Sequence, residues 1–330
     1  MDYSMKKITL VVMFSAVMLA MIAAPAQSFG ASLDRAALIK LADDYFAALV
    51  ARNPKAVPLA DNVRMVEQVK RIKPGEGLWQ TTTSGPTDFR IVVPDIVSQE
   101  VGGLIVLGVN GKPAYLGFRL KVENGRITET EHLIVEINNP DNPLAQRARP
   151  TFAVEIPYEY RDSRGRLIWI AKSYYDALDN NNGSLAPFGS DCERYENGMR
   201  TAPYGGPSLG GVGIPGTKPK VGQASLLGMH NCKSQLNTNT FHYIDTIDNR
   251  RVFAADEQTG VAVGISHLRH SMRDKKWKIL NTPGREEYDM SNQQPFDLPA
   301  MHIYKIWGGQ IHEIEAIGFA TDYNSPTGWE

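Results

Sequence analysis

Cysteine is almost absent from this sequence. Its 330 residues include two, Cys192 and Cys232, and neither stands in the CxxC or Cys/His spacing that zinc sites use. In an exported protein an isolated pair of this kind is able to form a disulfide. We therefore expect one bridge between them, with two buried free thiols as the alternative.

Several signatures of catalysis and cofactor binding are also missing. The sequence has no HExxH, no GxSxG and no glycine-rich phosphate or dinucleotide loop between a strand and a helix. The glycine-rich run at 205–213 lacks the lysine and the helix that a phosphate loop needs. The seven histidines are dispersed, so their spacing predicts no metal site. We expect neither a metal nor another cofactor.

An excess of positive charge is absent as well. Lys and Arg number 35 against 36 Asp and Glu, which gives a formal net charge of −1. No long basic run provides the electrostatic footprint that a polyanion needs. We therefore expect no nucleic-acid partner.

Only the N-terminus carries a long apolar run. Two lysines precede apolar residues from position 8 to about position 23, and Ala24-Pro25-Ala26 follows. This order is typical of a secretory signal peptide with a small-residue cleavage site. We predict cleavage before Gln27, a periplasmic or secreted protein, and no membrane contact after cleavage. The alternative is an uncleaved anchor, for which the run is short.

Repeated segments in the sequence indicate an internal duplication. An offset of 129 residues aligns LIKLADDYFAAL with LIWIAKSYYDAL, and both show the three- and four-residue spacing of an amphipathic helix. A closing hairpin, K-V/I-x-x-G-x-I-x-E-x-E, repeats at an offset of 184, and an intermediate match lies at 157. The surplus of the second copy falls into two insertions, 204–220 and 271 to about 299, which we expect to be loops.

These repeats predict the division of the chain. The polar stretch 138–150 contains three prolines, a composition typical of a linker. The prediction is therefore a signal peptide at 1–26, copy one at 32–137, a linker at 138–150 and copy two at 151–330.

Each copy runs helix, irregular segment, several strands and closing hairpin. With FRLKVENGRITETEHLIVE and YKIWGGQIHEIEAIGF as its clearest phrases, this pattern resembles the nuclear transport factor two-like and SnoaL-like superfamily, and within it a two-copy secreted family of unknown function. The resemblance implies an α+β fold of two tandem cone-like domains, each a curved mixed sheet packed against helices around an apolar pocket. It also implies an internal pseudo-dimer, as a monomer or in a homo-oligomer. It does not identify the chemistry, because the superfamily includes both enzymes and binding modules.

Polar residues in one copy at apolar positions of the other are candidates for a site. The strand LGFRLKV keeps one face apolar, whereas copy two has His302 and Tyr304 on that face. His267 and Arg269 continue an apolar face of GVAVGISHLRH, which we take to be extended relative to copy one. We predict that these four side chains surround one cavity of copy two.

Three further residues complete the candidate set. Asp191 would be a base or would orient a histidine, and the alternative is a turn or capping residue beside the disulfide. Tyr195 and His242 would bind substrate together with Arg269. His132, the lone histidine of copy one, falls where copy two has an alanine. We expect copy one to serve packing, with a second, different pocket as the alternative.

The candidate residues favour a cofactor-independent enzyme that transfers protons: a lyase, dehydratase or isomerase acting on a small organic substrate. His267 would be the base, His302 or Tyr304 the acid, and Arg269 the anchor for an anionic group. An aromatic or carbohydrate-derived substrate suits the exported location. The alternatives are a non-catalytic module that binds a small ligand and a purely structural pseudo-dimer. Convergence of the four side chains on one cavity discriminates among them.

Overall fold

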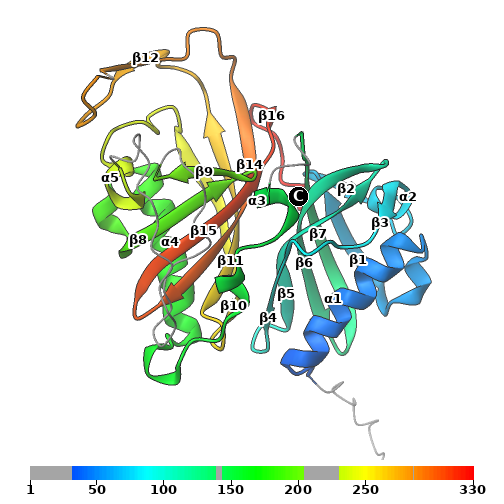
Figure 1. Cartoon of the computed structure of the whole chain (residues 1–330). Helices are drawn as coiled ribbons and strands as arrows, with labels where there is room; N and C mark the ends of the chain where they lie inside the picture. The colour runs from blue at the N-terminus through cyan, green and yellow to red at the C-terminus, as the bar shows by residue number, and fades with distance from the viewer. Residues whose placement is uncertain (1–31, 139–142, 204–229, 285) are drawn as a thin grey trace, which may run out of the picture.

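A computed structural model describes the chain as two domains that lie side by side, each built on one curved sheet (Figure 1). The C-terminus ends near the junction between them. The predicted signal peptide and the first predicted insertion fall outside the described residues, so both stay predictions. The structure describes residues 32–138, 143–203, 230–284 and 286–330.

Domain one contains a seven-stranded mixed sheet in the order β2-β1-β7-β6-β5-β3, with β4 also paired to β5. Its strands pair antiparallel except β1 and β7, which are parallel. Its elements are α1 (Arg35–Val50), η1 (Pro54–Ala56), β1 (Leu59–Glu67), β2 (Lys70–Ile72), α2 (Leu78–Thr81), β3 (Thr82–Ser84), β4 (Arg90–Asp95), β5 (Glu100–Val109), β6 (Lys112–Glu123) and β7 (Arg126–Glu136).

Domain two repeats this order as β9-β8-β15-β14-β11-β10, again with one parallel pair, β8 and β15. Strand β16 pairs with β14, and β12 and β13 form a separate hairpin sheet. The elements are α4 (Arg164–Asp179), η4 (Gly183–Leu185), β8 (Phe188–Glu196), β9 (Met199–Ala202), α5 (Cys232–Leu236), β10 (Thr246–Asp256), β11 (Val261–His270), β12 (Lys276–Lys278), β13 (Glu287–Asp289), β14 (Phe296–Trp307), β15 (Gln310–Gly318) and β16 (Thr321–Asp322), preceded by α3 (Pro143–Gln146), η2 (Pro150–Ala153) and η3 (Tyr158–Tyr160).

The matching strand order confirms the duplication and the α+β fold of two tandem cone-like domains. Helices α1 and α4 and strands β1 and β8 are related by the expected offset of 129 residues, and β6 and β14 by 184. The intermediate offset of 157 is wrong. Glu100 pairs with Lys121 and Val261 with Lys305, so β5 and β11 are related by an offset of 161. Both strands have ten residues, so copy two does not extend this strand.

The repeated hairpin closes through the same kind of turn in both domains. Asn124 and Gly125 have φ values of 53° and 75° between β6 and β7, and Gly308 and Gly309 have 57° and 77° between β14 and β15. Positive φ at both central residues suits a two-residue hairpin turn, because the twist of the turn then matches that of the strands. Asn and Gly tolerate this conformation best, which explains Asn-Gly in the first copy of the turn and Gly-Gly in the second.

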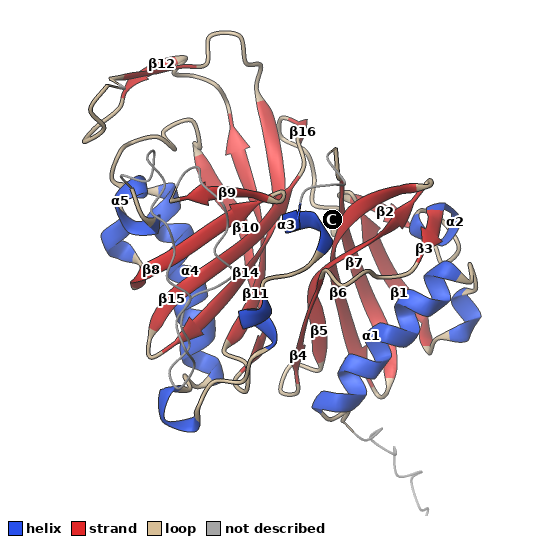
Figure 2. Cartoon of the chain, in the orientation of Figure 1, coloured by secondary structure: helices blue, strands red, loops and turns tan. Residues whose placement is uncertain are grey.

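Each long helix packs on the inner face of its own sheet (Figure 2). Helix α1 begins after Asp34, whose side chain accepts a hydrogen bond from the amide of Ala37 at 2.8 Å and caps the helix. The buried side chains of each helix recur every three or four residues and form one apolar core with the inward strand residues. In α1 they are Leu38, Leu41, Ala42, Tyr45, Phe46, Ala48 and Leu49.

The outer faces of the two sheets pack against each other. One apolar cluster joins them, and most of its side chains are at most 4% exposed, which buries the central strands on both faces. This packing forms the internal pseudo-dimer that the duplication implies. The cluster includes Ile91, Val93, Leu104 and Val106 from domain one and Phe253, Val261, Val263, Met301 and Ile303 from domain two.

Two ion pairs repeat reciprocally across this interface. Arg35 of domain one contacts Asp256 of domain two at 2.8 Å, and Arg164 of domain two contacts Asp95 of domain one at 2.7 Å. Arg164 is the duplicate of Arg35, and Asp256 is the duplicate of Asp95. Such an exchange of contacts is what two-fold symmetry produces at a self-complementary interface. The domains are therefore related like the subunits of a two-fold dimer.

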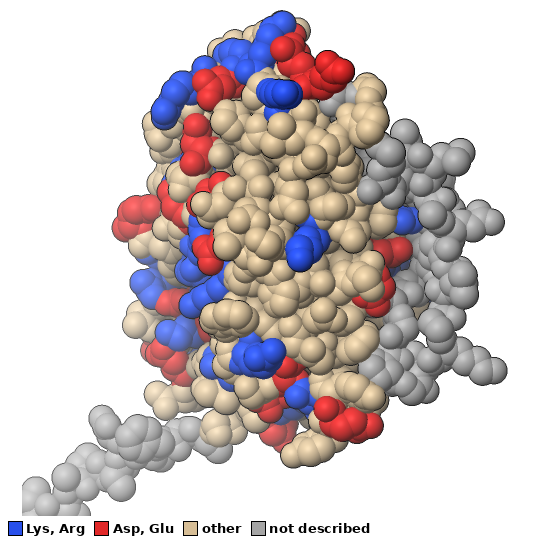
Figure 3. Space-filling view, turned by 90° about the vertical axis from the view of Figure 1, so that its left-hand side faces the viewer, with Lys and Arg blue, Asp and Glu red and all other residues tan. Residues whose placement is uncertain are grey.

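The face of domain two in Figure 3 carries acidic and basic side chains intermixed around its margin and few charges at its centre. Trp169 on α4 is 61% exposed. Within the described residues, none of the helices is long and apolar enough to cross a membrane.

Replacing Asp95 with alanine should destabilise the protein by about 3 kcal/mol, because it leaves Arg164 without its buried partner. Asp95 is fully buried, and its carboxylate also accepts a hydrogen bond of 3.0 Å from the amide of Ala255 across the interface. Chemical denaturation monitored by circular dichroism measures this loss.

The matched control is Lys40→Ala, which removes an exposed ion pair to Asp44 on α1. Exposed pairs of this kind contribute below about 1 kcal/mol. Equal stability of the two variants would contradict the role assigned to the interface pair.

Candidate ligand pocket of domain two

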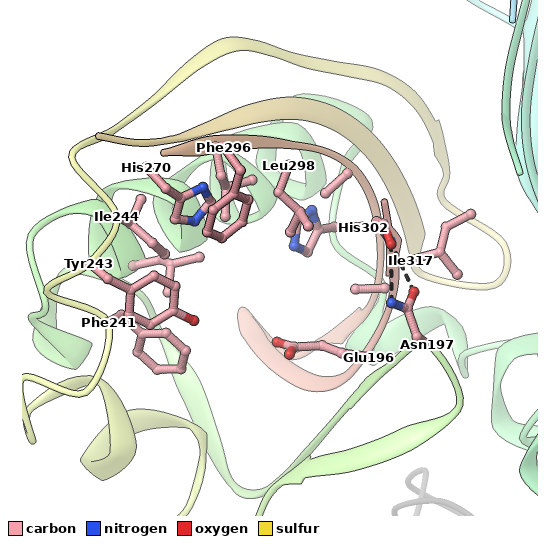
Figure 4. A pocket seen from close by; sticks show the side chains of 15 residues that line it. Glu196, Asn197, Phe241, Tyr243, Ile244, His270, Phe296, Leu298, His302 and Ile317 are labelled. Atoms are coloured by element: carbon pink, nitrogen blue, oxygen red, sulfur yellow. Dashed lines mark hydrogen bonds between the residues drawn. The ribbon is translucent and has the colours of Figure 1, made fainter. Parts of the chain in front are cut away.

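A pocket of about 170 Å³ lies within domain two, between the inner face of its sheet and the segment before β10 (Figure 4). We call it the domain-two pocket. Its wall is largely apolar, and the polar side chains that line it are Glu196, Tyr243, His270, His302 and Asn197, whose amide is hydrogen-bonded to the backbone of Gly318. The remaining lining residues are Leu178, Phe241, Ile244, Leu268, Phe296, Leu298, Ala300, Ala316, Ile317 and Gly318.

Strand register gives His302 the room to project into this pocket. On β14 it pairs with Gly264 of β11 on one side and with Ala316 of β15 on the other. Paired residues point to the same face of a sheet, so the imidazole stands between two very small side chains. Figure 4 shows the ring directed into the pocket.

The environment of His302 keeps its imidazole neutral. Its side chain is 4% exposed, and its ring centroid lies 5.4 Å from those of both Tyr174 and Tyr175. Burial, together with the positive charge of Arg194, lowers the pKa of His302 to about 3. Nδ1 has no hydrogen-bond partner among the described residues. A buried polar atom usually has a partner, so this unpaired nitrogen makes the imidazole a candidate functional group.

Arg194 and Glu196, both on β8, place a compensated charge pair at the edge of the pocket. Nε of Arg194 lies 3.0 Å from the carboxylate of Glu196, which is 40% exposed. Burial opposes the charged form of Arg194, but the neighbouring Tyr174 and Glu196 raise its pKa above the ordinary value. Arg194 also donates to Gln235 of α5 and stacks over Phe241. The guanidinium is thus held in place without leaving a net charge in the pocket.

The predicted disulfide between Cys192 and Cys232 is confirmed. It joins β8 to the first residue of α5, the helix that carries Gln235. Because Cys192 lies two residues before Arg194, the bridge holds α5 against the strand that carries the charge pair. The link therefore supports the charge pair at the edge of the pocket through Gln235.

The second insertion is not simply a loop. It contains the β12–β13 hairpin, whose Trp277 and Tyr288 stack with ring centroids 5.0 Å apart. Tyr288 stacks in turn on Tyr243, which stacks on His270. Burial lowers the pKa of His270 to about 4. A continuous series of rings thus connects the insertion of copy two to the pocket wall.

The buried histidine of domain one is held in a complete hydrogen-bond chain. His132 is fully buried, with Nε2 3.1 Å from the Tyr45 hydroxyl and Nδ1 3.1 Å from the Glu67 carboxylate. Tyr45 and Glu67 are the duplicates of Tyr174 and Glu196. The same framework therefore holds a satisfied hydrogen-bond chain in domain one and lines the pocket in domain two. That copy one serves packing stays a prediction.

The predicted convergence of four side chains on one cavity is wrong. His302 lines the domain-two pocket, and Tyr304 lies in the apolar core behind it. His267 and Arg269 lie on the opposite, outer face of the sheet. There His267 is hydrogen-bonded to Ser325 at 2.9 Å, and Arg269 pairs with Asp297 and donates to the Ser325 carbonyl at 2.8 Å. These two residues secure the C-terminal segment.

The other three candidates also lie outside the pocket. Asp191 is exposed on β8 and is hydrogen-bonded to His312 at 2.7 Å. Tyr195 points to the outer face, where the guanidinium of Arg149 lies 4.2 Å from its ring centroid. His242 is exposed and is hydrogen-bonded to Asp274 at 2.9 Å. None of these three residues lines the domain-two pocket.

The sequence analysis missed three of the polar lining residues, Glu196, Tyr243 and His270, as site candidates. A signal existed for Glu196, because the offset of 129 places it opposite Glu67 in the other copy. No pattern marked Tyr243 and His270, because their position depends on the packing of the insertion. Among the described residues, no three His, Cys, Asp or Glu side chains are arranged to hold a metal ion.

Comparison with family models matches the chain to a domain of unknown function, DUF8021, over residues 31–134 and 160–318. The two segments cover well over half of the chain, and the gap between them lies between the two domains. The chain belongs to the DUF8021 family. This confirms the expected membership of a two-copy family of unknown function. No curated protein matches the chain.

Solved structures similar to this DUF8021 chain include an NTF2-like protein of unknown function from Burkholderia xenovorans LB400, with 14% identity over 30% of this chain and 82% of that one and a TM-score of 0.25. A candidate polyketide cyclase from Xanthomonas campestris pv. campestris has 13% identity over 47% and 90%, with a TM-score of 0.28. A candidate SnoaL-like polyketide cyclase from Jannaschia sp. CCS1 has 9% identity over 48% and 89%, with a TM-score of 0.27. The fold assignment rests on the topology described above, because likenesses this low say nothing about chemistry.

Removing the disulfide by replacing Cys192 and Cys232 together with alanine should cost about 3–4 kcal/mol, because the bridge closes a loop with a sequence separation of 40 residues. Chemical denaturation of the double variant and of the wild type under non-reducing conditions measures the difference. A reduced wild-type protein should match the variant. Identical stability in all three samples would contradict this prediction.

The stability of the protein should fall as pH decreases from about 6.5 towards 4. His302 and His270 have folded-state pKa values of about 3 and about 4, whereas an unfolded histidine has a pKa of about 6.5. Between these values the unfolded chain binds more protons, so their neutral burial stabilises the fold above pH 6.5 and this stability is lost below it.

The His302→Phe variant should therefore show a shallower acid decline, by up to about 1.4 kcal/mol per pH unit. Denaturation midpoints measured at intervals between pH 4 and pH 7.5 test this. The control is His242→Ala, whose side chain is exposed and should leave the slope unchanged. A wild-type slope in His302→Phe would show that this histidine is not held neutral.

Proposed function

We propose that this DUF8021 protein binds one small, mainly apolar molecule in the domain-two pocket and that domain one supports domain two structurally. The single observation that carries this proposal is His302, a buried histidine that lines an apolar pocket with an unpartnered Nδ1. A concave apolar site with a few convergent polar groups is the usual form of a small-molecule site. Among the alternatives, the binding module therefore replaces the histidine-based enzyme.

Histidine acid–base chemistry has lost its geometric support. His267 and Arg269 lie on the other face of the sheet from His302. A general base works best when its pKa lies near the operating pH, and the pKa values of about 3 and about 4 for His302 and His270 are far from neutrality. In the pocket both rings act as neutral hydrogen-bonding groups.

One observation favours a second candidate function, a cofactor-independent lyase, dehydratase or isomerase. The Glu196 carboxylate and the Tyr243 hydroxyl both point into the pocket (Figure 4). A carboxylate base opposite a phenolic donor is sufficient for proton abstraction and stabilisation of the resulting anion. In this scheme Glu196, and not a histidine, takes the proton.

An exported location is part of the proposal. The signal-peptide pattern at 1–26 and the disulfide both suit a periplasmic or secreted protein, because disulfides persist in oxidising compartments. We also propose that the protein acts without nucleic acid and without membrane contact. The pseudo-dimer already pairs the two domains within one chain, as a monomer or within a homo-oligomer.

Glu196→Gln distinguishes the two candidate functions. Once a ligand is found, a binding module should retain its affinity within a few-fold, because the amide keeps the shape and an acceptor oxygen. A proton-transfer enzyme should lose turnover by at least about a hundred-fold, because the base is gone. Calorimetry measures binding, and product analysis by mass spectrometry after prolonged incubation measures turnover. Wild-type turnover abolished in Glu196→Gln would overturn the binding-only proposal.

A further inference from the structure

The dimensions and chemistry of the domain-two pocket restrict its ligand to one chemical class. This class rests on the proposed binding function. The volume of the pocket, the shape of its wall, its charge and its hydrogen-bonding groups each restrict the ligand.

The volume admits one ring. The pocket measures about 170 Å³, whereas sites for drug-sized ligands measure roughly 300–1,000 Å³. An apolar protein cavity of about 150 Å³ accommodates benzene. A single six-membered ring with a small substituent therefore fills the pocket, and a fused bicyclic compound exceeds it.

The wall is suited to a planar ring. Phe241, Tyr243, His270 and Phe296 line the same side of the pocket (Figure 4). The planes of Tyr243 and His270 differ by 20°, and those of His270 and Phe296 by 7°, with centroids 4.2 Å apart in the second pair. Nearly parallel rings present flat and edge surfaces that favour an aromatic guest over a puckered aliphatic ring.

The charge of the pocket selects a neutral ligand. Glu196 is paired with Arg194 at 3.0 Å, and the two pocket histidines are uncharged. An anion would meet the carboxylate of Glu196 with no free cation to balance it. A cation would lie near the positively charged guanidinium of Arg194. The carboxylate of Glu196 already balances that guanidinium, so it does not also balance a second positive charge. Either charge would also lose its hydration in a mainly apolar site.

The polar groups of the pocket require a hydrogen-bonding substituent. The imidazole of His302 is directed into the pocket and its Nδ1 lacks a partner. The hydroxyl of Tyr243 and the carboxylate of Glu196, which also pairs with Arg194, point into the same space. A hydroxyl group can donate to one of these acceptors and accept from the tyrosine. We propose that the ligand is a neutral single-ring aromatic compound with one hydroxyl-type substituent, such as a phenol or an aryl alcohol.

A panel of size-matched probes tests this class with the full mature chain. Isothermal titration calorimetry compares phenol and benzyl alcohol with benzoate, benzyltrimethylammonium, cyclohexanol and 2-naphthol. Phenol or benzyl alcohol should bind at least about ten-fold more tightly than each of the other four, which change the charge, the planarity or the size. One unpaired polar contact in a buried site is enough for a difference of this order.

A variant pair assigns the binding to this pocket. His302→Phe removes the free nitrogen and introduces the residue that domain one has at the duplicate position, Phe118, so we expect it to fold. It should weaken phenol binding by about ten-fold. His302→Gln, which restores a hydrogen-bonding group, should recover part of the affinity, and His242→Ala, outside the pocket, should bind like the wild type.

The outcomes separate the inference from the function on which it rests. Tighter binding of benzoate, of the ammonium compound or of the bicyclic alcohol, or equal binding of cyclohexanol, would overturn the ligand class and leave the binding function in place. Absence of binding by every probe, with the fold intact by circular dichroism, would overturn both. Phenol binding that is unchanged in His302→Phe would overturn the assignment to this pocket.

Discussion

The central strands of both seven-stranded sheets are buried on both faces, and this constraint decides where their side chains lie. The inner face packs on the long helix of its own domain, and the outer face packs on the other sheet. A polar side chain on a central strand therefore enters either a domain core or the interface between domains. Reciprocal ion pairs such as Arg35–Asp256 and Arg164–Asp95 hold the two sheets in a pseudo-two-fold arrangement.

The two domains use the same framework differently. In each domain a tyrosine of the long helix faces a buried histidine of the repeated hairpin. Tyr45 faces His132 in domain one, and Tyr174 faces His302 in domain two. In domain one His132 on β7 binds both Tyr45 and Glu67, which satisfies all three groups. In domain two the histidine lies on β14, the neighbouring strand, and Nδ1 of His302 remains without a partner. The histidine thus lies on opposite strands of the repeated hairpin in the two domains. In domain one this position gives a packed core, and in domain two it gives a pocket.

Two features of domain two support the elements that surround this pocket. The disulfide fixes α5, whose Gln235 binds Arg194. The second insertion supplies the hairpin whose Tyr288 stacks on Tyr243. Neither feature has a counterpart in the described part of domain one. Duplication followed by specialisation of one copy explains why the polar and aromatic side chains of the pocket come from the second half of the chain.

The sequence by itself determined the duplication, the helix and hairpin of each copy and the disulfide, because these depend on local periodicity, turn residues and composition. The fold followed from the resemblance that its phrases carry to a known superfamily. It identified His302 as a pocket residue, since an apolar face had gained a histidine. It misplaced His267 and Arg269 because both faces of β11 are apolar, and alternation cannot then tell the inner face from the outer one. Only the tertiary structure decided this, because the second partner of the sheet is the other domain. It also brought Glu196, Tyr243 and His270 together with His302, from elements far apart in the chain.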